Sequence, residues 1–269
     1  MPSAILLTGN HLRHLFVAHA MAKRLDLLGL WQEEKTFVPE KYAGNEGDLA
    51  VIQEHFDARD ASEEEFFGNT ARQSFPASLV HRRIAGGGVN EGAEIDAMIA
   101  LKPDVLLVYG TSILKENIIR AFEGRILNIH LGLSPYYRGS GTNFWPLVNR
   151  EPEYVGATIH YLDAGIDTGA IIQHVRPAMK IADGPHDIGN RTIIAAAEGL
   201  ADAAEAHCKG FLRSVPQTGK GKLYQRKDFN ADAVRRLYRN FKEGMIAEYL
   251  KDKAQRDAKI SLVSLSPAV

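Results

Sequence analysis

The stretch "PDVLLVYGTSILKENIIRAFEGRILNIH", residues 103–130, holds two apolar segments on either side of a segment with helical spacing. Residues 103–110 and 125–130 have the composition of buried strands, and such strand–helix–strand units join parallel neighbours in a sheet. The second strand alternates apolar and polar positions, which places Asn128 and His130 on one face. We therefore expect two polar side chains near a strand end, where open α/β sheets bind ligands.

The rest of the chain continues this alternation of strands and helices. Further strands are predicted at residues 4–10, 25–32 and 78–84 and on both sides of a Gly-rich turn in residues 156–175; helices are predicted at 11–25, 45–69, 91–102, 186–212 and 230–253. The last helix would be capped by Asn230 or Asp232, and the acidic run at 63–65 would be a solvated face. The pattern predicts an α/β fold, a Rossmann-like, mostly parallel sheet with flanking helices, followed by a short helical C-terminal appendage.

Composition narrows the function classes. The 32 Lys and Arg residues are balanced by 33 Asp and Glu residues, so the surface offers no net attraction to nucleic acid or to an anionic membrane. The single cysteine, Cys208, excludes an intramolecular disulfide, and we expect it to be buried and inert. No metal-ligand spacing and no targeting or membrane-spanning pattern is visible. These features predict a cytoplasmic protein with a small-molecule partner and no metal. The sequence leaves open whether the protein forms a homodimer.

Three motifs follow one another at specific spacing. Asn128 and His130 form N-x-H after an apolar strand, residues 135–139 form P-x-x-R-G, and G-x-D-x-G follows at residues 165–169 with Asp167 at its centre. Between residues 103 and 175 the order and spacing of these motifs resemble the folate-dependent formyltransferases, which act on glycinamide ribonucleotide, methionyl-tRNA or amino sugars. The resemblance implies the formyltransferase fold, with a catalytic domain at residues 1–215 and a C-terminal extension at 216–269 packed on it.

The resemblance also implies a catalytic set consisting of Asn128, His130 and Asp167. The chemistry independently requires these residue types, because formyl transfer to an amine develops negative charge on an oxygen, which the Asn128 amide and a protonated His130 would stabilise. A carboxylate such as Asp167 favours the imidazolium and accepts the proton of the amine. His160 lies on a neighbouring predicted strand, where a satisfied core histidine is at least as good an interpretation. The histidines on predicted helices, His14, His19 and His55, are expected to be structural or exposed.

The formyl donor implied by the resemblance is 10-formyltetrahydrofolate, held by backbone groups of two loops. The residues that match these loops are Ser112, Ile113, Leu114, Asp163 and Ile166. An apolar slot with a few backbone donors and acceptors suits a flat heterocycle, although Ile113 and Leu114 would equally suit a core. The candidate acceptor-binding residues are Asn10, Arg13, Tyr136, Tyr137 and Arg138. An aromatic pair beside an arginine can bind a ring and a phosphate, but such a loop can also simply pack.

The sequence favours formyl transfer to a primary amine, with a nucleotide-linked amino sugar as the acceptor. Glycinamide ribonucleotide is the alternative acceptor, but the first turn reads GNHLRHL at residues 9–15, where that enzyme has small residues that cradle a phosphate. A formate-releasing hydrolase stays open, because water could replace the amine. A non-catalytic ligand-binding protein is disfavoured because all three catalytic residue types are retained. A nucleotide-dependent oxidoreductase is disfavoured because G-x-G-x-x-G is absent from the first turn. A methionyl-tRNA substrate is disfavoured because no RNA-binding extension is visible.

Overall fold

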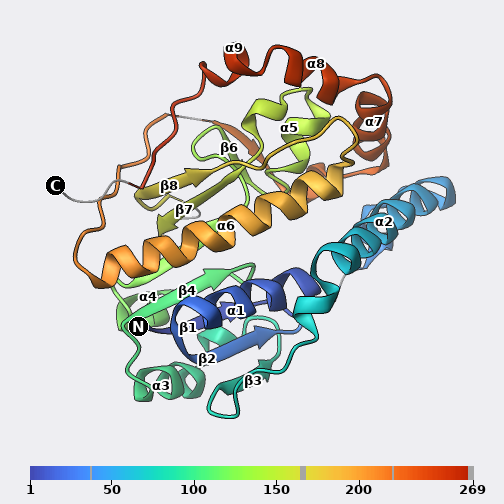
Figure 1. Cartoon of the computed structure of the whole chain (residues 1–269). Coiled ribbons are helices and arrows are strands. Elements are labelled where there is room, and N and C mark those ends of the chain that lie inside the picture. Colours follow the sequence, from blue (N-terminus) through green and yellow to red (C-terminus); the bar gives the residue numbers. More distant parts are fainter. Residues whose placement is uncertain (37, 164–167, 220, 266–269) are drawn as a thin grey trace.

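The computed structural model describes residues 1–36, 38–163, 168–219 and 221–265. Its centre is a seven-stranded sheet in the order β3-β2-β1-β4-β5-β7-β8 (Figure 1). Strands β3, β2, β1, β4 and β5 run parallel, and β7 is antiparallel to both β5 and β8. The strands are β1 Ser3–Thr8, β2 Asp26–Glu33, β3 Val80–Ile84, β4 Val105–Tyr109, β5 Ile126–His130, β7 Ala157–Tyr161 and β8 Ile171–Val175, with β6 Tyr137–Gly139 and β9 Lys222–Tyr224 forming a second, two-stranded sheet. The predicted mostly parallel α/β fold is confirmed.

Helices cover both faces of the sheet. The α-helices are α1 Leu12–Arg24, α2 Glu46–Ala71, α3 Gly92–Ala100, α4 Glu116–Ala121, α5 Phe144–Val148, α6 Pro185–Cys208, α7 Ala231–Lys242, α8 Met245–Lys251 and α9 Lys253–Asp257; short 3₁₀ helices are η1 Pro39–Tyr42, η2 Gly88–Asn90, η3 Pro152–Tyr154 and η4 Arg226–Asp228. The long helix α6 crosses the sheet beside α1 (Figure 1). Within the described ranges, no helix is long and apolar enough to cross a membrane.

The apolar run of β1 shows why this sheet needs helices on both sides. Ala4 and Leu6 are fully buried in the core that α1 and α6 complete, whereas Ile5 and Leu7 are fully buried in the core that α3 and α4 complete. Successive side chains of a strand point to opposite faces, so a strand without polar alternation must be covered twice. Each fully buried leucine or isoleucine contributes about 1.5–3 kcal/mol to stability.

The strand order reverses between β1 and β4, and this reversal positions the site. The chain builds β2 and β3 on one side of β1 and then returns to place β4 and β5 on the other side. The hydroxyl of Thr8, at the end of β1, donates a 2.7 Å hydrogen bond to the backbone carbonyl of Tyr109, at the end of β4. A crevice outside the carboxyl ends of strands at such a switch point is where α/β sheets bind ligands.

Several predicted elements differ from the observed ones. The segment around residues 45–69 forms one continuous helix, α2, whose Asn45 side chain accepts a hydrogen bond from the backbone N–H of Asp48. The acidic run is not wholly solvated, because Glu63 is 3% exposed and pairs with Arg13. The predicted helix at 230–253 breaks at Gly244, whose φ of +82° favours glycine, so α7 and α8 are separate helices.

The C-terminal extension packs on the body of the protein. Strand β9 pairs in parallel with β6, and α7 packs against α2 and α5. Of the two predicted caps of α7, Asn230 is the N-cap residue, and its side chain accepts a 3.0 Å hydrogen bond from the backbone N–H of Ala233. The predicted domain boundary at residue 215 stays a prediction.

Candidate active site

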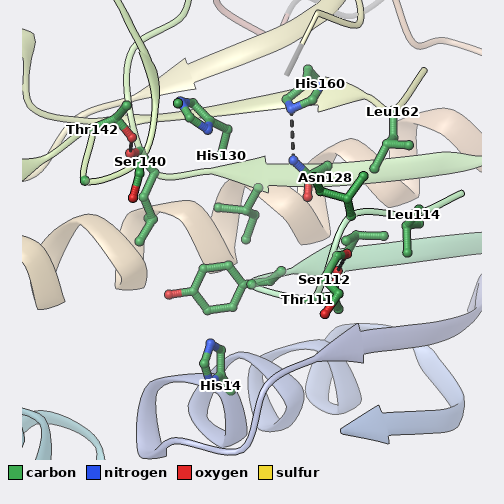
Figure 2. A pocket seen from close by; sticks show the side chains of 18 of the residues that line it. His14, Thr111, Ser112, Leu114, Asn128, His130, Ser140, Thr142, His160 and Leu162 are labelled. Carbon is green, nitrogen blue, oxygen red and sulfur yellow. Dashed lines mark hydrogen bonds between the residues drawn. The ribbon is translucent and has the colours of Figure 1, made fainter. Parts of the chain in front are cut away.

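A cavity of about 590 Å³ lies at the carboxyl ends of β4 and β5 (Figure 2). Asn128 and His130, which the sequence placed on one face of a strand, both line it. The side chain of His160 reaches the same cavity from β7. The opposite wall consists of the loop after β4 and the segment between β6 and α5, including Thr111, Ser112, Ser140 and Thr142.

Asn128 and His160 form the best-defined contact of the cavity. The two residues are directly paired across antiparallel strands, so their side chains project from one face of the sheet. The Asn128 Nδ2 atom lies 2.9 Å from the His160 Nε2 atom (Figure 2), and the His160 Nδ1 atom lies 2.8 Å from the backbone carbonyl oxygen of Tyr161. Because a carbonyl can only accept, Nδ1 carries the proton and Nε2 accepts from the Asn128 amide. His160 therefore fixes which way the Asn128 amide points.

The loop after β5 places His130. The side chain of Thr158, buried on β7, donates a 2.6 Å hydrogen bond to the Gly132 carbonyl and accepts a 2.9 Å bond from the backbone N–H of Ser134. A Cβ atom added to Gly132 would lie 2.9 Å from the His130 Nε2 atom and 2.6 Å from the Thr142 Cβ atom. This close approach requires glycine, and it packs the loop against the His130 imidazole.

Buried polar side chains hold the predicted donor-binding loop. The Glu33 carboxylate, fully buried at the end of β2, accepts hydrogen bonds of 2.6 Å from the backbone N–H of Ser112 and 2.8 Å from that of Gly87. The Asn90 side chain donates a 3.1 Å hydrogen bond to the Ile113 carbonyl and accepts a 2.7 Å bond from the backbone N–H of Lys115. These hydrogen bonds hold the loop backbone in place, and Ser112, Ile113 and Leu114 of the same loop line the cavity.

The predicted donor-binding residues lie at the cavity where they are described. Ser112, Ile113, Leu114 and Asp163 all line it. Ile113 is 72% exposed and so is not a core residue, whereas Leu114 is 6% exposed and also packs in the core beside α4. Asp167, the predicted catalytic carboxylate, and Ile166 lie outside the described residues.

His14, expected to be structural or exposed, forms part of the cavity wall (Figure 2). Its imidazole fits between two glycines, since an added Cβ would lie 2.8 Å from Nδ1 at Gly9 and 2.7 Å from Nε2 at Gly110. The backbone N–H of His11 donates a 3.1 Å hydrogen bond to the His14 Nδ1 atom, which leaves the proton on Nε2. Burial lowers the pKa of His14 well below its usual value, so the ring stays neutral.

The predicted acceptor-binding residues separate into two groups. Arg13 lines the cavity and forms an ion pair with buried Glu63. Asn10 and the aromatic pair do not line it. Tyr136 contacts the C-terminal segment through hydrogen bonds between its hydroxyl and the backbone of Ser261, and Tyr137 is 1% exposed and hydrogen-bonded to Glu151.

Packing against the C-terminal extension keeps the aromatic pair out of the cavity wall. The Tyr137 ring stacks on Tyr224 of β9, with ring centroids 6.0 Å apart, so the loop is occupied by the C-terminal extension. Arg138, next on the same strand, is also absent from the cavity wall. The interpretation of this loop as a packing element is therefore the one that the geometry supports.

The exposure of the cysteine overturns a further expectation. Cys208, expected to be buried, is exposed at the last residue of α6. Among the residues with described positions, no cluster of three or more His, Cys, Asp or Glu side chains could hold a metal ion. Sequence reasoning left His160 out of the catalytic set. The structure places His160 directly opposite Asn128, because β7 pairs antiparallel with β5, and no local sequence pattern indicates this pairing.

Solved structures of formyltransferases are similar to this chain in fold. A sugar N-formyltransferase from a Shewanella species has 16% identity and a TM-score of 0.53, over 85% of this chain and 78% of that chain. The phosphoribosylglycinamide formyltransferase of Anaplasma phagocytophilum has 14% identity and a TM-score of 0.55, over 84% and 98%. The sugar 3N-formyl transferase WlaRD has 18% identity and a TM-score of 0.53, over 86% and 72%.

The sequence itself matches a family over most of the catalytic region. Residues 47–204, which include Asn128, His130 and the loop after β4, match the formyl transferase family. The match spans more than half of the 269 residues. This chain therefore belongs to the formyl transferase family.

Proposed function

We propose that the protein transfers a formyl group from 10-formyltetrahydrofolate to the primary amine of a nucleotide-linked amino sugar. The observation that carries the proposal is the meeting of Asn128 and His130 in one cavity with the Ser112–Leu114 loop. The first two side chains supply hydrogen-bond donors, and the loop supplies backbone groups and an exposed isoleucine. One cavity thus offers both a place for a flat ring and a place for acyl-transfer chemistry.

The residues present fit a folate donor. The cavity volume of about 590 Å³ falls within the range of small-molecule sites. Ile113, which is 72% exposed, lines the cavity and offers an apolar side chain against which a pterin can lie. The donor supplies an electrophilic formyl carbon when it is bound. The crystal structure of WlaRD, which is similar in fold, was determined in the presence of dTDP and 5-N-formyl-THF.

The chain's own residues would then stabilise the oxygen that becomes negative as the amine adds to the formyl carbon. One N–H of the Asn128 amide is used by His160, and no described residue accepts from its other N–H. That second N–H and the His130 imidazole are the donors for the oxyanion. Asp167, as the sequence predicts, would accept the proton that the amine loses. The bond between the formyl carbon and the donor nitrogen would then break, and the donor nitrogen would leave with that proton. No covalent enzyme intermediate is required.

The first turn of the chain supports the amino-sugar acceptor over glycinamide ribonucleotide. The His14 ring fills the space between Gly9 and Gly110, where a small residue would leave room for a phosphate. The Arg13 guanidinium is neutralised by the buried carboxylate of Glu63. A phosphate cradle at the start of α1 is therefore not supported by either the shape or the charge of this turn.

The direct test is an acceptor panel. The purified protein is incubated with 10-formyltetrahydrofolate and with nucleotide-linked amino sugars, glycinamide ribonucleotide, or no amine, and products are identified by mass spectrometry. We expect the amino sugar to gain one formyl group while release of formate without acceptor stays slow. The Asn128→Ala variant, which keeps the fold but loses one donor, serves as the matched control.

The other outcomes each identify a competing function. Efficient formylation of glycinamide ribonucleotide, with no activity on any amino sugar, would replace the proposed acceptor. Rapid formate release without an amine would make the protein a hydrolase. Binding of folate without turnover of any kind would leave a ligand-binding protein.

A further inference from the structure

A second cavity of about 520 Å³ adjoins the candidate active site. The two cavities share part of their walls, including Arg13, Lys35, Ser140 and Phe144. The second cavity is enclosed by α2, by the segment around η1 and by η4 of the C-terminal extension. Figure 1 shows α2 and α7 on the same side of the molecule, and the two helices are in contact.

Aromatic rings make up much of the wall of this second cavity. Tyr42, Phe56, Phe144 and Phe229 line it, and each is partly exposed. Phe229 is central, since its ring centroid lies 5.1 Å from that of Phe144, 5.4 Å from that of Tyr42 and 5.7 Å from that of Phe56. Partly exposed rings around a cavity provide stacking surfaces for a planar ligand.

The wall of the second cavity also carries positive charge. Lys35 and Arg226 line it, and no carboxylate of the described chain lies within ion-pair distance of either residue. Arg13 and Arg59 line it as well and share the buried carboxylate of Glu63. Two cations that form no ion pair with a described carboxylate are suited to an anionic ligand, and phosphate is an anion that both side chains bind well.

The order of these groups selects the ligand. Arg13 and Lys35 lie at the junction of the two cavities, because they line both, whereas Phe229 and Arg226 line only the second. A ligand that spans both cavities therefore meets hydrogen-bond donors in the first cavity, cations at the junction, and aromatic rings together with Arg226 in the second. A nucleotide-linked amino sugar has this order: amine, diphosphate, base. The glutamate tail of a folate instead places its negative charge beyond its rings.

We infer that this second cavity binds the nucleoside diphosphate of the acceptor, with the base against Phe229 and the phosphates near Lys35 and Arg226. The inference rests on the proposed function, which identifies the acceptor as a nucleotide-linked amine. It concerns only where the nucleotide of that acceptor binds and makes no statement about formyl transfer. Because Arg226 and Phe229 belong to the C-terminal extension, the extension contributes directly to the choice of acceptor.

The test is isothermal titration calorimetry of the full chain with UDP, dTDP and ADP, in the absence of any folate. We expect at least one nucleotide to bind, and inorganic pyrophosphate to bind more weakly because it has no ring. Arg226→Ala should weaken the nucleotide about tenfold or more, since a charge-assisted bond to phosphate is lost. Lys227→Ala, an exposed neighbour absent from the cavity wall, is the charge-matched control and should change binding less than about twofold.

A second variant tests the aromatic wall. Phe229→Leu keeps an apolar side chain in the cluster but removes the ring, so the nucleotide should weaken about fivefold or more while pyrophosphate is unaffected. The melting temperature of each variant shows whether the fold is retained. 5-Formyltetrahydrofolate should bind all variants with the affinity it has for the unchanged protein.

The inference is overturned if no nucleotide binds, or if Arg226→Ala and Lys227→Ala weaken binding equally. It is also overturned if Arg226→Ala weakens a folate polyglutamate and leaves nucleotides unchanged, since the cavity would then hold the donor's tail. Nucleotide binding without any formyl transfer would contradict the proposed function alone. Formyl transfer to an amine without nucleotide binding would contradict the inference alone.

Discussion

Replacing His160 by phenylalanine tests whether this residue acts through Asn128. The change keeps an aromatic ring on β7 but removes the Nε2 atom that lies 2.9 Å from Asn128 Nδ2. A buried amide that loses its acceptor can rotate, and one neutral hydrogen bond is worth about 0.5–1.5 kcal/mol. We therefore expect kcat to fall by about tenfold at the upper end of that range, with the KM for the formyl donor nearly unchanged.

A double-mutant cycle separates positioning from direct catalysis. Asn128→Ala alone should lower kcat by about a hundredfold to a thousandfold, as loss of an oxyanion donor does. If His160 acts through Asn128, then His160→Phe added to Asn128→Ala should cost little more. His160→Gln, which can present an acceptor oxygen at a similar place, should recover part of the activity.

Steady-state kinetics and melting temperatures of the four proteins in the cycle give the answer. Full additivity of the two losses would refute the positioning role, because it would mean that His160 contributes independently of Asn128. A His160→Phe protein with the unchanged kcat would refute the importance of the amide orientation itself.

The other predictions concern His130, its loop and a buried histidine. His130→Ala should lower kcat at least about a hundredfold while folate binding, measured by calorimetry, persists; near-normal turnover would remove the catalytic assignment. Gly132→Ala should abolish most activity, because the added Cβ would lie 2.9 Å from His130 Nε2, whereas Gly189→Ala in α6, with no atom within 4 Å, should be active and slightly more stable; equal activities would refute the packing argument. Burial lowers the pKa of His55 from 6.5 to about 3. As the pH falls below 6.5, the His55 side chain is protonated in the unfolded chain but stays neutral in the folded protein. The folded protein therefore loses stability between about pH 6.5 and pH 3. Chemical unfolding should show that the free energy of unfolding falls by about 2 kcal/mol from this residue between pH 7 and pH 5, and that the His55→Gln variant lacks this part of the fall. If the difference in unfolding free energy between the two proteins is the same at both pH values, the prediction is contradicted.

Strand periodicity predicted the part of the site that lies on one element. Asn128 and His130 share a face because they are two positions apart on β5, and this depends on local geometry alone. The loop at Ser112–Leu114, which the family resemblance assigned to donor binding, lines the same cavity because it follows β4 at the sheet edge, and its role in binding stays a prediction. The shared face of Asn128 and His130 needs only neighbours in sequence.

Contacts between distant segments escaped prediction. His160 meets Asn128 only because β7 enters the sheet antiparallel, which no local pattern indicates. Tyr137 resembled a binding residue, but β9, more than eighty positions later, stacks Tyr224 on its ring. Glu63 looked solvated within an acidic run, yet Arg13 of α1 neutralises it in the interior. In each case a partner far along the chain decides whether the side chain is buried, exposed or bound.

The most direct test of the central claim follows the formyl carbon itself. The protein is given 10-formyltetrahydrofolate with an isotopically labelled formyl group and a nucleotide-linked amino sugar, and the label is located by nuclear magnetic resonance. The account predicts that the label appears as a formamide on the sugar nitrogen with the unchanged protein, and at least about a hundredfold more slowly with Asn128→Ala or His130→Ala. Label that stays on the folate, or that reaches the sugar at the same rate with these variants, would contradict it.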